Sequence, residues 1–274
     1  IRKQGAVFHA DWSDDPCYYK DPDTKEIVAY DFFGGNIQGI IEKLGYLQEL
    51  GISVIYLNPI FESESNHHYD TGDYLKVDPI LGNEKDFQEL IKKAAAKGIR
   101  VILDGVFSHT GSNSRYFNRK GQYDSVGAFQ STKSPYYEWY SFRNFPHEYE
   151  SWWNFNTLLN VTETTPSYMD FIIRQPESVL HHWLRQGIAG WRLDVIDELP
   201  EPFSKGFYAE LKKTDPEAVM IGEVWEDASH KVAYGMQREY LCGQEMDSAM
   251  NYPFSKILFD YLLGYADGSS CFRQ

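Results

Sequence analysis

Apolar residues recur at helical spacing in several stretches of the chain, and a short apolar run follows each of them. The first stretch starts at Asn36 and stops before Gly51, and the second starts at Asn83 and stops before Gly98. Apolar positions at i, i+3 and i+4 predict an amphipathic helix, and a glycine after the last turn predicts its end. Asp86, three residues after Asn83, strengthens the second start as a capping pair. The apolar runs predict buried strands over residues 52–57, 99–103, 188–193 and 219–224.

The alternation of amphipathic helices with short apolar strands predicts an α/β fold in which helices cover a parallel sheet. Two further strands are expected near Ala6 and Ser248, which brings the count to six, and a last helix is expected over residues 255–263. A (β/α)8 TIM barrel has eight strands. The expected fold is therefore a TIM barrel with about six of its eight strands in this chain.

One interval between predicted strands is much longer than the others. Residues 109–165 are rich in Tyr, Trp, Phe, Ser, Asn and Gly and show no helical period. Such a stretch predicts a small irregular domain inserted after the third strand. The expected organisation is a first part of the barrel over residues 1–108, the insertion over 109–165, and a second part with strands four to six over 166–274. Pro166 is expected to restart a helix capped by Thr165.

Composition narrows the class of ligand. The 274 residues are 42% hydrophobic and 16% aromatic, which is enough for the core of one barrel domain. The formal charge of −14 repels polyanions, so nucleic acid and anionic membrane surfaces are not expected as partners. A neutral ligand fits this charge better, although an acidic excess also serves solubility alone.

The cysteines and the N-terminus bear on the compartment. Cys17, Cys242 and Cys271 are odd in number and have no C-x-x-C spacing, so they are expected to be reduced thiols without a metal. The chain shows no signal peptide and no apolar run of membrane-spanning length. It also lacks an initiator Met, so its start is interpreted as trimmed. These features favour a cytoplasmic protein.

Polar residues stand where predicted strands end, which is where a parallel barrel carries its functional groups. The third strand ends in Asp104, the fourth in Arg192 and Asp194, and the fifth in Glu223. Arg192 and Asp194 lie two positions apart and so share a face. A guanidinium beside Asp194 keeps it ionised, as a nucleophile requires, and Glu223 is placed to protonate a leaving group. Two carboxylates about 5–5.5 Å apart are typical of retaining glycoside hydrolysis.

Two residues in the loops fit a sugar ligand. Tyr69 offers a flat face to a sugar ring, and His109 offers a donor to a hydroxyl. Each candidate also has a purely structural interpretation, because Asp104 or Asp194 alone could cap a helix or pair with Arg192, and a single buried His is common in a core. The order of the whole set along successive strand ends is what favours catalysis.

That ordered set resembles the catalytic domain of the α-amylase superfamily, and most of all its bacterial neopullulanase-like and cyclomaltodextrinase-like members. The resemblance extends over essentially all 274 residues. The matching segments are Phe33-Gly-Gly-Asn-Ile-Gln-Gly, Tyr56-Leu-Asn-Pro-Ile-Phe, His68-Tyr-Asp-Thr-Gly-Asp-Tyr, Asp104-Gly-Val-Phe-Ser-His, Gly190-Trp-Arg-Leu-Asp and Gly222-Glu-Val-Trp. In this order and combination they are highly specific, although each segment alone is weak or moderate.

The resemblance implies a catalytic role for each matched residue. Asp194 would form the glycosyl-enzyme bond, Glu223 would act as the acid and then as the base, and Arg192 would position Asp194. Tyr69 would stack on the sugar at the cleavage point, and His109 would bond a sugar hydroxyl. The implied activity is retaining hydrolysis of an α-glucan such as starch, maltodextrin, cyclodextrin or pullulan, in the intact parent protein.

The resemblance also makes the insertion the family's small second domain. Its aromatic residues Trp139, Trp152, Trp153 and Phe155 are interpreted either as a carbohydrate platform or as the rings that hold this small domain together. Asp70 would support the loop of Tyr69. The expected substrate-binding residues are Tyr69, Asp70, Asp104, His109, Trp153 and Trp225.

Two positions depart from the family pattern. Ser108 stands where the family usually has an Asn that helps to bind a structural Ca2+. A hydroxyl is a poorer ligand than an amide carbonyl, so Ser108 counts against Ca2+ at this point. The resemblance therefore implies no definite cofactor. The family's third catalytic acid, an Asp preceded by His, has no counterpart before Gln274. The 274-residue chain by itself is therefore expected to be inactive.

Two other functions are compatible with the same scaffold. One is a non-catalytic interaction protein, against which the joint presence of Arg192, Asp194 and Glu223 counts. The other is an α-glucan transglycosylase, which would share the nucleophile and acid/base and differ only in the acceptor. The sequence leaves open the preferred linkage, internal or terminal cleavage, and the oligomeric state.

Overall fold

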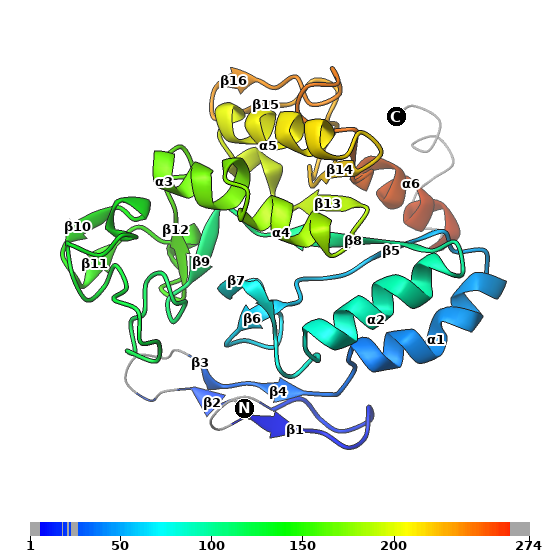
Figure 1. Ribbon diagram of the computed structural model, residues 1–274, viewed down its shortest axis with the longest axis horizontal. Coiled ribbons are helices and arrows are strands. Elements are labelled where there is room, and N and C mark those ends of the chain that lie inside the picture. Colours follow the sequence, from blue (N-terminus) through cyan, green and yellow to red (C-terminus); the bar gives the residue numbers. More distant parts are fainter. Residues whose placement is uncertain (1–5, 18, 21, 23–26, 264–274) are drawn as a thin grey trace.

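A parallel sheet of five strands lies at the centre of the molecule (Figure 1). The computed structural model describes residues 6–17, 19–20, 22 and 27–263. The sheet curls into half of a barrel, and all of its neighbouring strands run parallel, in the order β17-β14-β13-β8-β5. The predicted TIM-barrel class is thereby confirmed. The five strands are β5 (Val54–Tyr56), β8 (Arg100–Gly105), β13 (Gly190–Leu193), β14 (Val219–Gly222) and β17 (Ser248–Ala249).

The strand expected near Ala6 does not belong to this sheet. It forms as β1 (Val7–Phe8) but pairs with β4 (Asp31–Phe32), in parallel. The backbone N–H of Val7 donates to the Tyr30 carbonyl, and that of His9 donates to the Phe32 carbonyl. The rings of Phe8 and Phe32 stack. The sheet of the described residues therefore has five strands, one fewer than the sequence-based count. Close by, β2 (Tyr19–Lys20) and β3 (Ile27–Ala29) form an antiparallel pair.

The predicted helices cover the sheet (Figure 1). They are α1 (Ile37–Glu49), α2 (Glu84–Ala95), α4 (Val179–Arg185) and α5 (Glu201–Thr214). The Asn36 side chain accepts the backbone N–H of Gly39, which caps α1, and Asn83 and Asp86 form the predicted reciprocal capping box of α2. These starts are confirmed because each cap satisfies backbone donors that have no partner in the first helical turn.

The helix expected at Pro166 is shorter than its sequence suggests. An α-helical turn, α3 (Pro166–Met169), runs directly into a π-helical turn, η3 (Asp170–Arg174). Thr165 does not cap it: its hydroxyl donates instead to the carbonyl of Glu138. The expected cap is therefore wrong, because a backbone acceptor in the neighbouring segment competes for the hydroxyl.

Short hairpins and single turns fill the intervals between the barrel strands. The antiparallel pair of β6 (Phe61–Ser63) and β7 (Thr71–Val77) carries the loop that contains Tyr69 and Asp70. The long segment after β8 leaves through β9 (His109–Gly111) and returns through β12 (Leu158–Asn160), which pair with each other. The remaining short elements are β10 (Phe142–Asn144), β11 (Glu148–Tyr149), β15 (Val232–Ala233), β16 (Met236–Gln237), η1 (Tyr137–Trp139), η2 (Trp152–Asn154) and η4 (Ile196–Glu198).

Aromatic side chains fill the space between the sheet and its helices. Trp191 on β13 is fully buried and contacts the rings of Phe107 and Phe207. Trp183 of α4 is also buried, and its indole N–H donates to the carbonyl of Tyr74 at 2.8 Å. Such a core fixes the helices against the sheet and so holds the strand ends in register.

The last described helix, α6 (Tyr252–Leu263), buries none of its residues. It begins shortly after β17 in the sequence, and Figure 1 shows it at the side of the molecule. No helix in the described part of the chain is both long enough and apolar enough to cross a membrane.

Candidate active site

One guanidinium joins three carboxylates at the ends of three adjacent strands. Arg192 Nη1 donates to Asp194 Oδ1 at 2.7 Å and to Asp104 Oδ1 at 2.9 Å. Its Nη2 lies 2.8 Å from Glu223 Oε2. All four residues are at most 8% exposed. The structure thus brings together the residues that the sequence predicted as nucleophile, acid/base and positioning group.

Strand register explains why these residues meet. On β13, Arg192 is paired with Asp104 of β8 on one side, and Leu193 with Gly222 of β14 on the other. Asp194 and Glu223 each follow directly after these pairs. Parallel strands end at the same edge of a sheet, so polar residues at successive strand ends converge on one point.

The backbone after Asp194 is strained. Val195 has φ of 36° and ψ of 65°, a left-handed conformation that a β-branched residue rarely adopts. In this conformation the Val195 N–H donates to Glu223 Oε2 at 2.9 Å, and the next N–H, of Ile196, donates to the Glu223 carbonyl. Strain of this kind costs about 1–3 kcal/mol and is often found at functional sites. Here it turns a backbone donor towards Glu223.

The electrostatic setting of Asp194 differs from that of a free carboxylate. Burial raises its pKa, and the nearby negative charge of Asp104 raises it further, whereas Arg192 opposes both effects. Burial likewise raises the pKa of Asp104. The three carboxylates share one cation, so their ionisation is coupled and Arg192 alone does not neutralise them.

Glu223 is held in its ionised form. Burial by itself would raise the pKa of Glu223, but the Val195 N–H, the charge of Arg192 and the hydroxyl of Tyr252 together lower it below the usual value. Tyr252 of α6 donates to Glu223 Oε1 at 2.8 Å. In this arrangement Glu223 is a carboxylate, which suits a base better than an acid.

Two tyrosines reach the same group of carboxylates. Tyr69 donates to Asp104 Oδ2 at 3.3 Å, and Tyr56 of β5 donates to the same oxygen. The Arg192 guanidinium also lies over the Tyr56 ring, 5.8 Å from its centroid. The sequence analysis did not single out Tyr56 or Tyr252, although Tyr56 stands at a strand end, which is the signal that identified the other candidates.

His109 lies deep in the site and is neutral. Burial lowers its pKa to about 4, so it carries no charge at neutral pH. Its Nδ1 lies 3.0 Å from Ser108 Oγ, and its ring contacts Trp152. Its Nε2 is buried and has no hydrogen-bond partner among the described residues. A buried nitrogen without a partner is unfavourable, and a ligand hydroxyl would satisfy it.

The remaining predicted site residues fall into two groups. Asp70 accepts the backbone N–H groups of Glu64 and Ser65 within its own loop and does not reach the carboxylates. Trp153 is 60% exposed and its ring meets that of Trp225 edge-on, 6.0 Å between centroids. An exposed ring from the long segment after β8 therefore lies beside an exposed ring from the end of β14.

The other aromatic residues expected in a carbohydrate platform lie in two different environments in the structure. Trp152 stacks on Trp153 and on Phe155. Trp139 is only 2% exposed and packs against Tyr168, so it is a core residue and cannot offer a face to a sugar. For Trp139 this burial favours the second interpretation given above, a ring that holds the small domain together, over a carbohydrate platform.

Ser108 itself is a poorer ligand for the family's calcium ion than the usual Asn. The Ser108 hydroxyl is already within hydrogen-bond distance of His109. Among the described residues, no group of three His, Cys, Asp or Glu ligands converges near it. Ca2+ takes six to eight oxygen ligands. The cavity at Ser108 is also lined by Glu150, Glu163 and Glu198 and by Asn160, whose side-chain oxygen is buried without a hydrogen-bond partner among the described residues.

The parallel half-barrel with charged side chains at its strand ends fits the catalytic domain of a barrel glycoside hydrolase. Residues 15–266 match the family "Alpha amylase, catalytic domain". The chain belongs to this family.

Curated relatives and solved structures agree. An amylopullulanase of Thermoanaerobacterium saccharolyticum is 42% identical over 96% of this chain and 22% of its own length. A cyclomaltodextrinase of Thermoanaerobacter pseudethanolicus is 37% identical over 92% of this chain and 42% of its own. The cyclic α-maltosyl-(1→6)-maltose hydrolase of Arthrobacter globiformis superposes with a TM-score of 0.78 at 28% identity, over 98% of this chain and 55% of that one. The chain thus spans about a fifth of the amylopullulanase it matches.

Proposed function

We propose that this chain carries the nucleophile and the acid/base of a retaining α-glucan hydrolase. The observation that carries the proposal is the contact of Arg192 with Asp104, Asp194 and Glu223 at the ends of three adjacent parallel strands. A non-catalytic role does not require three buried carboxylates on one cation, an arrangement with a large desolvation penalty.

The reaction follows from the two carboxylates. Asp194 attacks the anomeric carbon, the glycosidic bond breaks, and the departing oxygen takes a proton from the carboxylic acid form of Glu223. Glu223, now a carboxylate, removes a proton from water, and the resulting hydroxide displaces Asp194 from the sugar. Two displacements at the same carbon retain its configuration.

The resting electrostatics impose a condition on the first step. Arg192, the Val195 N–H and Tyr252 favour the carboxylate form of Glu223, whereas burial and Asp104 favour protonation of Asp194. Both preferences are the reverse of what the first step needs. We infer that substrate entry must loosen Glu223 from Arg192 and Tyr252.

The proposed substrate site surrounds these groups. Residues 109–165 form the small second domain, which brings Trp153 to Trp225 at the rim. Tyr69 faces the sugar at the cleavage point, His109 Nε2 bonds a hydroxyl, and Asp70 keeps the Tyr69 loop in place. The relatives are named for pullulan, cyclomaltodextrin and a cyclic maltosyl-maltose, so the proposed substrates are α-glucans of this kind.

The setting of the protein is proposed from charge and thiols. A formal charge of −14 disfavours nucleic acid as a partner. Cys17 and Cys242 are free thiols, which are typical of a reducing compartment, so we place the protein in the cytoplasm.

The test compares natural and activated substrates. The full-length gene product is assayed on maltoheptaose, cyclodextrin and pullulan, and on α-maltosyl fluoride, whose fluoride leaves without protonation. Asp194→Asn should lose activity on all four substrates. Glu223→Gln should lose activity on the three glucans but still release fluoride from α-maltosyl fluoride. Glu177→Gln, at a side chain that is 83% exposed, is the matched control and should change nothing. Equal loss of fluoride release in both site variants would contradict the assigned roles.

A further inference from the structure

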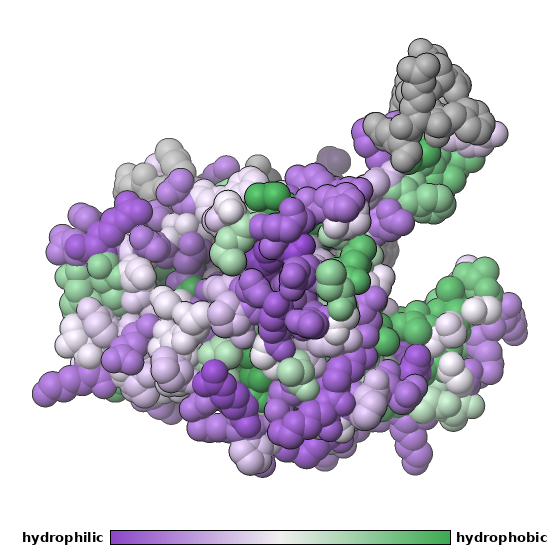
Figure 2. All heavy atoms as spheres, turned by 90° about the horizontal axis from the view of Figure 1, so that it is seen from above, coloured by the Kyte–Doolittle hydropathy of each residue, from purple (hydrophilic) through white to green (hydrophobic). Residues whose placement is uncertain are grey.

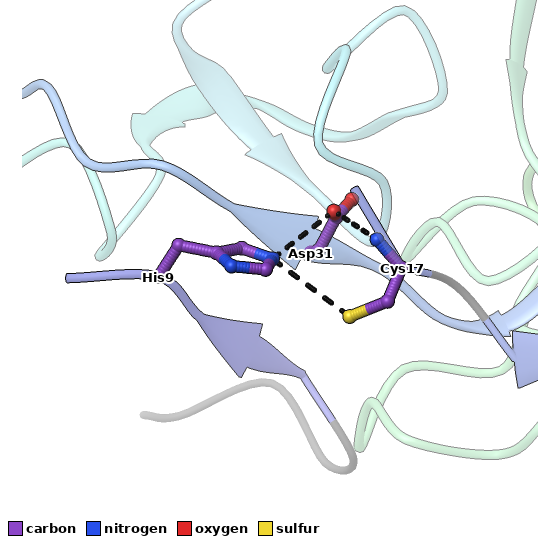
Figure 3. Close-up of side chains that lie close together, drawn as sticks. All are labelled: His9, Cys17 and Asp31. Carbon is purple, nitrogen blue, oxygen red and sulfur yellow. Dashed lines mark hydrogen bonds and ion pairs between the residues drawn. The ribbon is translucent and has the colours of Figure 1, made fainter. Parts of the chain in front are cut away.

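Three potential metal ligands converge beside β1 and β4 (Figure 3). His9 directly follows β1, Cys17 lies in the next loop, and Asp31 begins β4. Their ligand atoms all lie within 4.8 Å of one another. The side chains of His9 and Asp31 are only 9% and 8% exposed.

The side chains of Asp31 and Cys17 both approach the same ring nitrogen of His9, Nε2. His9 Nε2 lies 3.2 Å from Asp31 Oδ2 and 3.7 Å from Cys17 Sγ. Zn2+ holds nitrogen at about 2.0–2.1 Å, carboxylate oxygen at about 2.0–2.2 Å and sulfur at about 2.3 Å. A tetrahedral centre with these bonds separates nitrogen from oxygen by about 3.4 Å and nitrogen from sulfur by about 3.6 Å. The two observed separations from His9 Nε2 are therefore close to those of ligands on one ion, and the third pair of ligand atoms lies within 4.8 Å.

The surroundings orient each ligand. The other ring nitrogen of His9, Nδ1, lies 3.3 Å from Asp14 Oδ2, and the ring stacks on Phe33 at 4.1 Å. The Cys17 backbone N–H donates to Asp31 Oδ2 at 2.7 Å, which fixes the carboxylate beside the sulfur. A carboxylate on the far nitrogen of a ligand histidine is the usual second partner in protein metal sites.

The proton on the histidine decides what the group can bind. When Nδ1–H donates to Asp14, Nε2 presents a lone pair to a carboxylate oxygen and to a sulfur. The Nε2 lone pair then faces the Asp31 oxygen with no proton between them, and the Cys17 thiol is the neighbouring donor. A cation at their centre would turn this repulsion into attraction.

We propose that His9, Cys17 and Asp31 bind a divalent transition metal of the Zn2+ type. Thiolate and imidazole ligands select such ions over Ca2+ or Mg2+, which prefer oxygen. Binding releases the thiol proton of Cys17 to solvent, and a water completes the tetrahedron. The ion ties the loop after β1 to β4, and this role is independent of the proposed hydrolase chemistry.

Sequence spacing explains why the group was not predicted. Cys17 is eight residues from His9 and fourteen from Asp31, and neither spacing belongs to a known local motif. The three positions come together only because β1 pairs with β4.

The test uses Co2+ as a spectroscopic probe and Zn2+ as the competing ion, on the full chain purified with a chelator. The wild type should bind one Co2+ with a thiolate-to-metal charge-transfer band, which Zn2+ abolishes. Cys17→Ser should lose the band, and Cys242→Ser, at an exposed thiol, should keep it. Asp14→Asn should weaken Zn2+ binding about 10–100-fold, since it removes only the partner of His9 Nδ1.

A second measurement guards against variants that fail to fold. Zn2+ should raise the thermal unfolding midpoint of the wild type and of Cys242→Ser, because a ligand that binds only the folded state stabilises it. It should leave the midpoint of Cys17→Ser and His9→Asn unchanged. Absence of the charge-transfer band in the folded wild type, or its survival in Cys17→Ser, would overturn the proposal in favour of a metal-free ion pair of His9 with Asp14 and Asp31.

Discussion

At the scale of single residues, Arg192 holds the site together. Its two terminal nitrogens contact Asp104, Asp194 and Glu223, and its side chain is 6% exposed. A guanidinium presents several donors in one rigid plane, whereas a lysine ammonium is a compact point charge. Removal of this cation would leave three buried carboxylates without the positive charge that balances part of theirs.

Arg192→Met should therefore lower the free energy of unfolding by about 3–5 kcal/mol, the usual effect of breaking a buried ion pair from one side. Urea unfolding at pH 7 measures this change. The control is Arg185→Met, because the Arg185–Glu177 pair is exposed, and its effect should stay within about 1 kcal/mol. Equal effects of the two substitutions would show that the carboxylates do not depend on Arg192.

His109 gives the fold a defined pH dependence. Its pKa is lowered from 6.5 to about 4 in the folded state, so between these values the unfolded state binds a proton that the folded state does not. The stability from neutral His109 is present above pH 6.5 and is lost as pH falls towards 4, a change on the order of 3 kcal/mol. Urea unfolding at pH 7 and pH 4.5 should show a smaller loss in His109→Gln than in the wild type. An identical loss would mean that His109 is not buried in its neutral form.

At the scale of elements, the sequence predicts what periodicity and caps determine. The helices α1 and α2 begin at the predicted caps because Asn36 and Asn83 bond the free N–H groups of the first turn. Three of the sheet's strands form within predicted apolar runs, and β8 extends two residues past its run. The strand β13 is buried throughout, as continuous hydrophobicity predicts, whereas β5 lies at the edge of the described sheet and exposes Val54 and Tyr56. Convergence of Arg192 with Glu223 follows from their places at neighbouring strand ends.

Features set by long-range contacts could not be predicted in the same way. Val7–Phe8 pairs with β4 rather than with β5, a choice between partners that a two-residue strand does not encode. Tyr252 reaches Glu223 from α6, about thirty positions further along the chain. Neither periodicity nor a local motif carries information about such contacts.

The pairing of β13 with β14 depends on one glycine. Gly190 has φ of +146°, and a Cβ built there would lie 2.0 Å from the carbonyl oxygen of Val219. Gly190→Ala should push the strands apart and lower the free energy of unfolding by about 2 kcal/mol or more. Gly45→Ala, in the middle of α1 with no atom within 4 Å of the added Cβ, should instead raise it by about 0.5–1 kcal/mol. Chemical denaturation of both variants checks the sign, and stabilisation by Gly190→Ala would contradict the strand geometry.

At the scale of the whole molecule, the described chain leaves apolar surface uncovered. The helix α6 buries none of its residues, and Phe254, Phe259 and Leu262 are 60%, 60% and 67% exposed. Figure 2 shows apolar side chains gathered at one end of the molecule, next to grey atoms. Exposed apolar patches of this kind bind hydrophobic dyes and promote association.

The 274-residue chain should accordingly bind the dye ANS while folded. Replacing Phe254, Phe259 and Leu262 by Ser should lower the ANS fluorescence at least about twofold, since these are three of the most exposed apolar side chains of α6. Val126→Ser, at an isolated exposed position, is the control and should leave the signal unchanged. A signal that the triple substitution does not reduce would place the dye site elsewhere.

The identity of the nucleophile is the central claim, and covalent trapping tests it most directly. The full-length gene product is treated with 5-fluoro-α-maltosyl fluoride, which forms the glycosyl-enzyme without acid assistance and slows its hydrolysis. Mass spectrometry of the digested protein should locate one maltosyl-derived adduct on the peptide that contains Asp194, in the wild type and in Glu223→Gln, and none in Asp194→Asn. An adduct on any other carboxylate, or its persistence in Asp194→Asn, would contradict the account.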